Sequence, residues 1–282
     1  MLPPSLLAWG RPRLRDLPWR QVRDPWPILV SEVMLQQTRV ERVVDRWPRF
    51  LERFPRPAAC AEASPGDVIA EWSGLGYNRR ALNLHRTATV VVGLHGGDLP
   101  RTLEDLLSLP GVGPYTARAV LAFAYEDDVA VVDTNVARIM ARWTGRRLTV
   151  REAQGLADAS VPIGEGWAWN QVVIDLGATI CRARGPQCGD CPLASGCTWR
   201  GTGPDPAVGS AGVAGRQASF DGSDRQGRGR LVARLAEGPV AGSDLAEAMG
   251  WPDDQERAER VAAGLVAGGL VVSAPVGYAL PG

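Results

Sequence analysis

Apolar residues in the first two thirds of the chain recur mostly at helical spacing. From Pro25 to about Ile180 there is almost no sustained alternation of apolar and polar positions, the pattern typical of strands. The segment after Pro27, ILVSEVMLQQTRVERVVDRWPRFLERF, predicts two successive helices. Another helix is expected from about Pro65 to the glycine-rich residues 74–78. The main body is therefore predicted to be all-α.

A helical hairpin is expected at residues 102–125, TLEDLLSLPGVGPYTARAVLAFAY. Gly111 and Gly113 let the backbone turn tightly between the two helices, and the second helix has an apolar face. Amides at the start of that helix then point outward, where they can bind a phosphate oxygen without reading base sequence. Many helical hairpins use such a turn only for packing, so the turn alone leaves both interpretations open.

The C-terminal part has a different composition. Residues 201–219 consist mainly of glycine, proline and small side chains without aromatics, which predicts a flexible linker. Residues 220–282 predict helices near 224–236, 243–249 and 253–267, followed by a short hairpin in LVVSAPVGYAL. We therefore expect a body over residues 1–200, a linker over 201–219 and a small winged-helix-like domain over 220–282.

Composition and charge limit the class of protein. No run of about 18 apolar residues is present, and the first 20 residues lack the pattern of a secretory signal, so we expect a cytoplasmic protein without membrane association. The formal net charge is zero. The first 200 residues carry 24 arginines against 21 acidic residues, and the remainder carries 7 against 10. A nucleic-acid surface is therefore expected in the first part of the chain.

The chain contains no lysine, because all 31 basic side chains are arginine. A Schiff base with a sugar aldehyde needs an amine. A lyase mechanism that depends on a lysine is therefore excluded, and only the N-terminal amine could substitute.

Four cysteines form the most specific signal in the sequence. They have six, two and five residues between them: Cys181, Cys188, Cys191 and Cys197. Thiolates so close in sequence can surround one tetrahedral centre, either zinc or an iron-sulfur cluster. Disulfides are the less favoured alternative, because bridges over such short loops suit small secreted domains. The remaining cysteine, Cys60, is expected to pack in a core.

Two carboxylates stand in unusual surroundings. Asp133 follows four apolar residues in VAVVDTNVARI, where it can cap the next helix, and a cap position would also keep it ionised. Glu32 lies among apolar residues in ILVSEVML, where burial would favour the protonated form and a role as general acid. From the local sequence alone, an exposed Glu32 on the polar face of its helix is the favoured alternative.

Hydrolysis of a glycosidic bond needs both kinds of carboxyl group. One donates a proton to the leaving group, and the other stays anionic to stabilise or attack the cationic sugar. The same requirement holds when the leaving group is a nucleobase.

Several motifs together resemble the helix-hairpin-helix DNA glycosylases, and within them the adenine-specific enzymes. The resemblance covers about residues 5–200. It rests on the cysteine spacing and on SEVMLQQT (31–38), GLGY (74–77), NLH (83–85), LPGVGPYTA (109–117), VVDTNVARI (131–139) and NQVVIDLGATIC (170–181). It implies a two-lobed helix-hairpin-helix fold and a monomeric base excision repair enzyme. The implied partner is double-stranded DNA in the nucleoid, with adenine mispaired with 8-oxoguanine or guanine.

The resemblance also implies residue roles. Glu32 would protonate adenine, and Asp133 would stabilise the oxocarbenium ion or form a transient covalent bond, supported by Tyr115 and Asn135. The cysteines would hold a 4Fe-4S cluster. DNA and base contacts would come from Trp19, Arg20, Gln37, Leu75, Tyr77, Gly111, Gly113 and Gln171.

The chain departs from this family in two places. Asn78 occupies a position where the family often has a second aromatic side chain, so Gln37 and Leu75 are expected to carry more of the insertion. The 63 residues at the C-terminus are too short for the 8-oxoguanine-recognising domain that many relatives carry. Their predicted recognition helix has four acidic residues against two arginines, which favours packing or protein contact over binding of the lesion strand.

Two other functions account for some of these features. Endonuclease III has a similar fold and cluster, but it carries a lysine nucleophile where this chain has Tyr115. An iron-sulfur, winged-helix regulator would explain the cysteines and the tail. It would not explain Glu32 and Asp133 within their motifs.

Overall fold

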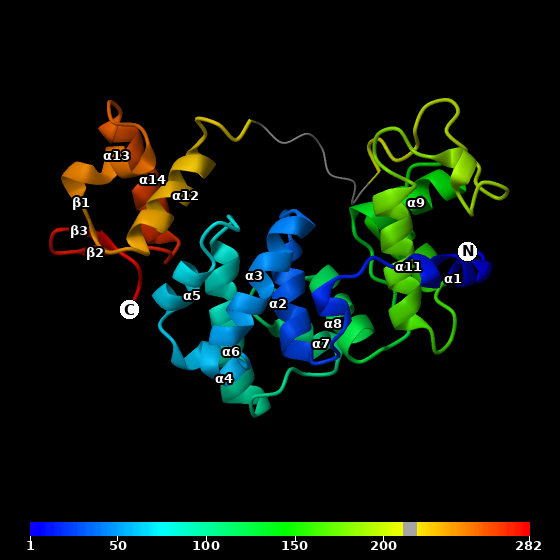
Figure 1. Ribbon diagram of the computed structural model, residues 1–282, viewed down its shortest axis with the longest axis horizontal. Helices are drawn as coiled ribbons and strands as arrows, with labels where there is room; N and C mark the ends of the chain where they lie inside the picture. Colours follow the sequence, from blue (N-terminus) through cyan, green and yellow to red (C-terminus); the bar gives the residue numbers. More distant parts are fainter. Residues whose placement is uncertain (211–218) are drawn as a thin grey trace. The chain divides into compact units, whose positions relative to one another are not determined.

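The computed structural model describes residues 1–210 and 219–282, which are mainly helical (Figure 1). The two helices expected after Pro27 are present, and the first begins two residues before that proline. The prediction of an all-α body is confirmed. Its helices are α1 (Ser5–Gly10), α2 (Pro25–Leu35), α3 (Val40–Arg53), α4 (Pro57–Glu62), α5 (Pro65–Glu71), α6 (Arg79–His95), α7 (Leu103–Ser108), α8 (Pro114–Ala124), α9 (Thr134–Thr144), α10 (Val150–Asp158) and α11 (Gly166–Thr179).

The described residues form two compact units. The first unit contains residues 1–28, 101–107 and 113–210, and the second contains residues 29–100, 108–112 and 219–282. The chain passes from one unit to the other inside α2 and again inside α7.

The core of the first unit lies among α1, α9, α10 and α11. Leu6, Ile139, Met140, Trp169 and Leu176 are each at most 2% exposed and pack in one cluster. Burial of such side chains is the main stabilising contribution of the unit. This core holds the start of α9 and the loop after α11, which carry Asp133 and the cysteines.

The core of the second unit contains aromatic side chains from α3 and from the residues that directly follow α3 and α5. The ring of Phe50 lies 4.9 Å from that of Phe54 and meets the ring of Trp72 edge-on at 5.8 Å, both favourable aromatic geometries. Cys60 is fully buried, as expected from the sequence, and burial raises the pKa of its thiol to about 12. This unit holds the second half of α2, which carries Glu32.

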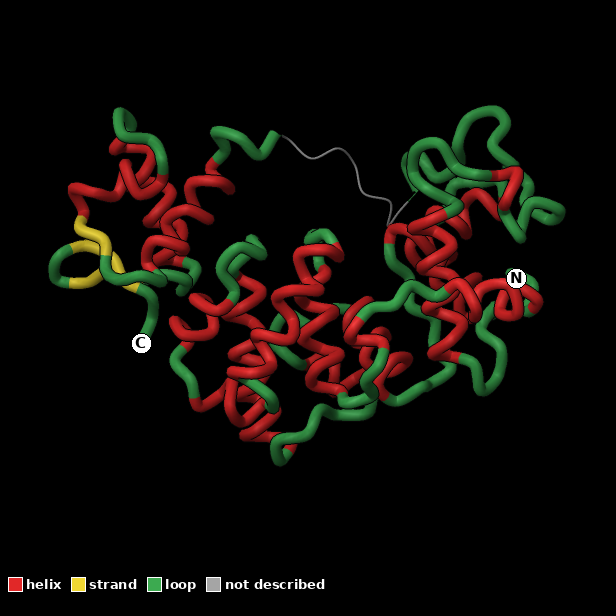
Figure 2. The backbone as a smooth tube through the Cα atoms, viewed as in Figure 1, coloured by secondary structure: helices red, strands yellow, loops and turns green. Residues whose placement is uncertain are grey.

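The C-terminal residues contain the strands found in the described part of the chain (Figure 2). The strands pair antiparallel in the order β1-β3-β2, and β2 and β3 form the short hairpin expected from the sequence. A winged helix stays a prediction. The elements are α12 (Asp224–Leu235), β1 (Val240–Ala241), α13 (Leu245–Met249), α14 (Gln255–Ala267), β2 (Val272–Ala274) and β3 (Gly277–Ala279).

Residues 201–210 differ from the flexible linker expected over 201–219. Ala207 is 1% exposed and Ser210 is 4% exposed, and the Ser210 hydroxyl oxygen accepts a hydrogen bond from the Leu148 amide. Asp205 is paired with Arg142 of α9. These long-range partners hold a glycine- and proline-rich segment that composition alone assigns to a linker. The rest of the expected linker, residues 211–218, lies outside the described residues.

Among the described residues, no helix combines the length and the apolar character needed to span a membrane.

Candidate active site and cysteine loop

Asp133 is the N-cap of α9, as the sequence predicted. Its Oδ1 accepts hydrogen bonds from the amides of Asn135 and Val136 at 2.8 and 2.7 Å, and its Oδ2 accepts one from Asn135 Nδ2 at 2.7 Å. The three donors and the positive end of the helix dipole stabilise an anion here.

The largest influence on the pKa of Asp133 is the loss of water around its carboxyl group. Desolvation raises the pKa of its carboxyl group above the ordinary 3.8, while the hydrogen bonds from Val136 and Asn135 and the charge of Arg138 oppose that rise. Asp133 as a whole residue is intermediate in exposure. Such a carboxylate is positioned to face a developing positive charge.

Arg138 connects this carboxylate to the cysteine loop. Its Nη2 donates to Asn135 Oδ1 at 2.8 Å, and its Nε donates to the Cys181 carbonyl oxygen at 2.8 Å. Asn135 is therefore held between Asp133 and Arg138. Arg138 was not among the residues predicted from the sequence, although an arginine among the apolar residues of α9 is a signal that could have found it.

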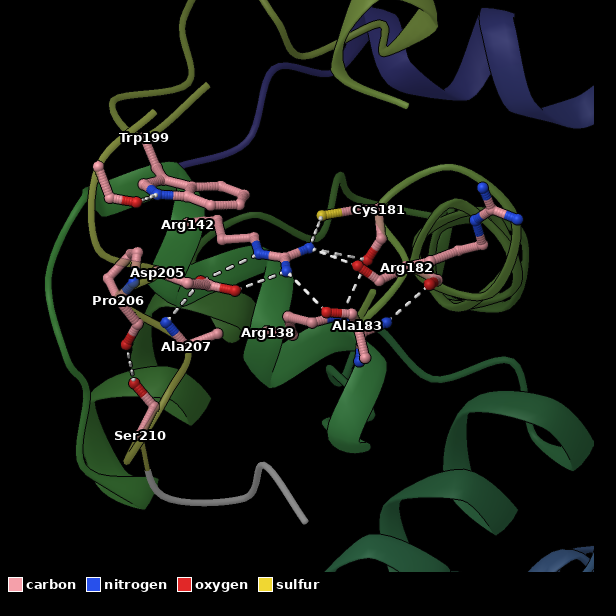
Figure 3. Close-up of polar contacts among 12 residues, drawn as sticks. Arg138, Arg142, Cys181, Arg182, Ala183, Trp199, Asp205, Pro206, Ala207 and Ser210 are labelled. Carbon is pink, nitrogen blue, oxygen red and sulfur yellow. Dashed lines mark hydrogen bonds and ion pairs between the residues drawn. The ribbon is translucent and has the colours of Figure 1, made fainter. Parts of the chain in front are cut away.

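Arg142, one turn further along α9, anchors the loop at both of its ends (Figure 3). It is 2% exposed and donates to Cys181 Sγ at 3.3 Å and to the Arg182 carbonyl oxygen at 2.8 Å. Its Nη2 lies 2.7 Å from Asp205 Oδ2, and its guanidinium lies 4.5 Å from the centroid of the Trp199 ring. One buried guanidinium thus connects the start of the cysteine segment to the residues that follow it.

The four cysteines of the 181–197 loop are all partly buried and free of disulfides, so the disulfide alternative is not supported. Within residues 1–210 and 219–282, no three Cys, His, Asp or Glu side chains meet in metal-ligating geometry. The thiols are nevertheless close enough that negative charge on Cys181 and Cys197 raises the pKa of both Cys188 and Cys191, after desolvation as the largest cause. Four soft donors gathered in one loop fit a metal cluster chemically.

The residues expected to line the base pocket lie in the first unit. Trp19 and Arg20 occupy a short 3-10 turn and are each 6% exposed, and Gln171 on α11 is 5% exposed. Both terminal nitrogens of Arg20 pair with Asp175 at 2.8 Å, whereas its buried Nε has no hydrogen-bond partner among the described residues. Tyr115, the second residue of α8, is half-buried against the cluster of Ile28, Ala119, Ala122, Phe123 and Val131.

Glu32 lies in the middle of α2 and is 4% exposed. The alternative of an exposed glutamate on a polar helix face is therefore wrong. The helix is buried around most of its circumference here, with Val30 fully buried and Val33 6% exposed. Glu32 belongs to the second unit and Asp133 to the first, so their meeting around one nucleotide stays a prediction.

Two loops of the second unit carry the residues expected to insert into DNA. Gln37 and Tyr77 both have left-handed backbone conformations, with φ of 57° and 48°. Gln37 and Tyr77 are exposed, and Leu75 is 4% exposed. Left-handed conformations at non-glycine residues cluster at functional sites, which agrees with the role that the resemblance implies for these loops.

The hairpin turn uses its two glycines differently. Gly111 has φ of 76°, and a Cβ atom there would lie 2.7 Å from the side chain of Asn83 on α6. Gly113 caps α8 in an extended conformation, and a Cβ atom there would meet nothing within 4 Å. Gly111 is thus required by packing and backbone conformation. Gly113 leaves open space at the amides of an 11-residue helix, where an anion can approach.

Comparison with known proteins agrees with this geometry. The family model described as "HhH-GPD superfamily base excision DNA repair protein" matches residues 30–155. Adenine DNA glycosylases of Mycobacterium tuberculosis and Mycolicibacterium smegmatis are 44% and 41% identical to the chain. The alignments cover 99% of this chain in both cases, and 93% and 96% of those proteins.

Solved structures with a similar fold include a thermostable thymine-DNA glycosylase, with a TM-score of 0.67 and 31% identity over 70% of this chain and 93% of that one. A non-covalent endonuclease III–DNA complex has a TM-score of 0.62 and 25% identity, covering 69% of this chain and 91% of that one. The helix-hairpin-helix class is thus defined by fold and sequence together. Within that class, the chain belongs to the adenine DNA glycosylase family.

Proposed function

We propose that the protein hydrolyses the N-glycosidic bond of adenine mispaired with 8-oxoguanine or guanine in double-stranded DNA. The carrying observation is the carboxylate of Asp133, fixed by three N–H donors at the start of α9. Fixed negative charge of this kind stabilises the positive sugar that forms as the base leaves. Relatives that cover nearly the whole chain and bear the name adenine DNA glycosylase support adenine as the leaving base.

In the proposed reaction, Glu32 donates a proton to N7 of the extruded adenine, and the C–N bond to the sugar then breaks. Glu32 is 4% exposed, and a buried general acid is the kind of group that can deliver a proton to a leaving base. Asp133 stabilises the oxocarbenium ion or adds to it transiently, and water completes the hydrolysis. Tyr115 and Asn135 support Asp133.

Residues other than Glu32 and Asp133 are proposed to extrude the adenine from the duplex and to hold it. Trp19, Arg20 and Gln171 line the pocket for the extruded adenine. Gln37 and Tyr77, which are exposed, insert beside it, which offsets the cost of unstacking. Leu75, to which the resemblance also assigns insertion, is buried at 4% exposure. The amides that follow Gly113 bind the DNA backbone.

The proposed enzyme is monofunctional and leaves an abasic site. The chain contains no lysine that could attack the sugar aldehyde, whereas a lyase step needs an amine nucleophile. Reduction with borohydride in the presence of adenine-containing DNA should therefore trap no covalent complex. Trapping that persists after the N-terminal amine is blocked would contradict this part of the proposal.

Cys181, Cys188, Cys191 and Cys197 are proposed to hold a 4Fe-4S cluster, with zinc as the less favoured alternative. The cluster would act as a structural cross-link of the loop after α11, without a redox step in base removal. The protein is proposed to act as a monomer on chromosomal DNA in the cytoplasm.

The C-terminal residues are proposed to serve in packing or protein contact. Both arginines of α14, the expected recognition helix, donate to Asp224, Arg257 at 2.8 Å and Arg260 at 3.2 Å. The acidic side chains of that helix would repel DNA phosphates. These pairings support a role away from the lesion strand.

Single-turnover excision on four duplexes tests the proposal, with adenine opposite 8-oxoguanine, guanine, cytosine or thymine. Free adenine is expected from the first two duplexes, and little from the others. An iron-loaded, folded protein that releases no adenine from any of them would refute the proposed function.

A further inference from the structure

Arg80, in the first turn of α6, is a buried cation with no assigned role in the proposed reaction. It is 8% exposed, and every hydrogen bond described for it goes to a neutral oxygen. Burial lowers the pKa of its guanidinium to about 10. Burying a guanidinium without an anionic partner costs free energy, so the burial of Arg80 needs a physical explanation.

One side of the guanidinium holds the end of α2. Arg80 Nη1 donates to the carbonyl oxygens of Val33 and Met34 at 2.8 Å each and to that of Gln36 at 2.6 Å. The last carbonyls of a helix lack intrahelical donors, and a cation at that end also complements the helix dipole. Arg80 thus fixes the backbone that leads from the helix of Glu32 into Gln37.

The other side holds the second loop. Arg80 Nη2 donates to the carbonyl oxygens of Leu75 and Gly76 at 3.1 and 2.8 Å, and to Thr38 Oγ1 at 3.0 Å. Thr38 Oγ1 also lies 3.3 Å from the Leu75 carbonyl oxygen, so the two loops are joined directly. The guanidinium lies 5.6 Å from the centroid of the Tyr77 ring. Left-handed residues in both loops, Gln37 and Tyr77, therefore flank one buried group.

We propose that Arg80 is a positioning residue that locks the Gln37 loop and the Leu75–Tyr77 loop into one rigid element for insertion into the DNA duplex. The inference rests on the proposed function and assigns to Arg80 no contact with the base. A planar guanidinium can serve acceptors on two sides at once, whereas a lysine ammonium is a compact point charge. Lysine at this position keeps the charge and loses the link between the loops.

The test compares Arg80→Lys with wild type on two substrates under single-turnover conditions. One substrate has adenine opposite 8-oxoguanine. The other has adenine opposite an abasic site, where no base pair has to be broken for extrusion. Arg80→Lys should excise adenine about 10- to 100-fold more slowly from the first substrate, the loss expected for charge-assisted hydrogen bonds, and within about threefold of wild type from the second. Arg86→Lys, an exposed arginine on the same helix, should match wild type on both.

A second variant covers the case in which Arg80→Lys fails to fold, as judged by thermal denaturation. Thr38→Val removes the bridging hydroxyl at nearly constant volume and should slow excision selectively on the 8-oxoguanine duplex, by about three- to tenfold. Thr89→Val is its control, because that exposed hydroxyl donates only within α6, to the His85 carbonyl oxygen.

Equal losses on both substrates, or no loss in folded variants, would overturn the positioning role and leave the proposed function standing. A wild-type protein that releases no adenine from either substrate would overturn the proposed function and this inference with it.

Discussion

The start of α9 and the middle of α2 each carry one carboxyl group, and their surroundings differ. Asp133 is half-buried and accepts three hydrogen bonds at a helix N-terminus. Glu32 is 4% exposed and lies between Ser31 and Val33 in the interior of a helix, away from its positive end. The first environment supplies three hydrogen-bond donors to a carboxylate, and the second is the buried interior of a helix. The comparison teaches that the two carboxyl groups differ in their surroundings, and the proposed function assigns them different roles on that ground.

Removing the anion should have the largest effect. Asp133→Asn keeps a good helix cap, so the fold and DNA binding should persist. Single-turnover excision should fall by about 10³- to 10⁴-fold, the scale seen when a group that stabilises transition-state charge is removed. DNA binding, measured by fluorescence anisotropy, should stay within about threefold of wild type. Loss of binding together with loss of rate would indicate that Asp133 is mainly structural.

A substitution of Arg138 breaks the connection between Asp133 and the cysteine loop while leaving Asp133 itself unchanged. Arg138→Met removes the donors to Asn135 and to the Cys181 carbonyl oxygen. Excision should fall by about 10- to 100-fold, because the charge-assisted hydrogen bond that orients Asn135 beside Asp133 is lost. Arg151→Met, an exposed arginine on α10, is the control and should retain the wild-type rate. An unchanged rate in Arg138→Met would separate the cysteine loop from the chemistry.

The dependence of the excision rate on pH tests the assignment of Asp133 as the anionic group. Desolvation raises the pKa of Asp133, and only its anion stabilises the cationic sugar. Excision should therefore decline about tenfold per pH unit once the pH falls below the pKa of Asp133. That pKa lies above 3.8, the ordinary value for an aspartate. Single-turnover rates between pH 4 and 8, with circular dichroism to verify folding, would measure this acid limb. A rate that is flat down to the ordinary aspartate value would show that Asp133 is not perturbed in this way.

The smallest effects are expected on stability. Asp133→Ala leaves three N–H donors without their acceptor and removes a helix cap, so the free energy of unfolding should drop by about 1–2 kcal/mol. Glu32→Gln keeps the shape of the side chain and should change that free energy by less than about 0.5 kcal/mol. Urea denaturation of both variants measures the difference. A large destabilisation in Glu32→Gln would mean that Glu32 is held for folding and not for proton donation.

Local features of the fold could be predicted from the sequence. Helical periodicity indicated α2 and α3, and the position of Asp133 after an apolar run indicated the cap of α9, because caps and periodicity depend on neighbouring residues. The tight turn at Gly111 could also be predicted, because a turn of this kind depends on neighbouring residues as well.

Features that depend on distant partners could not be predicted. Local sequence favoured an exposed Glu32, but the folded chain leaves it 4% exposed. Composition suggested a linker over 201–219, but Arg142 binds Asp205 of that segment, 63 residues further along the chain. Arg80 contacts carbonyl oxygens up to 47 residues away. Sequence spacing gives no signal for such contacts, because the three-dimensional fold alone brings the atoms together.

The most direct measurement of the central claim uses a substrate that cannot accept the proton. Adenine and 7-deazaadenine, which has a C–H group in place of N7, are placed opposite 8-oxoguanine, and release of each base is measured with wild type and with Glu32→Gln. Wild type should release adenine and not 7-deazaadenine, and Glu32→Gln should bind both duplexes and release neither base at the wild-type rate. Release of 7-deazaadenine as fast as adenine, or full activity in Glu32→Gln, would contradict the division of roles between Glu32 and Asp133.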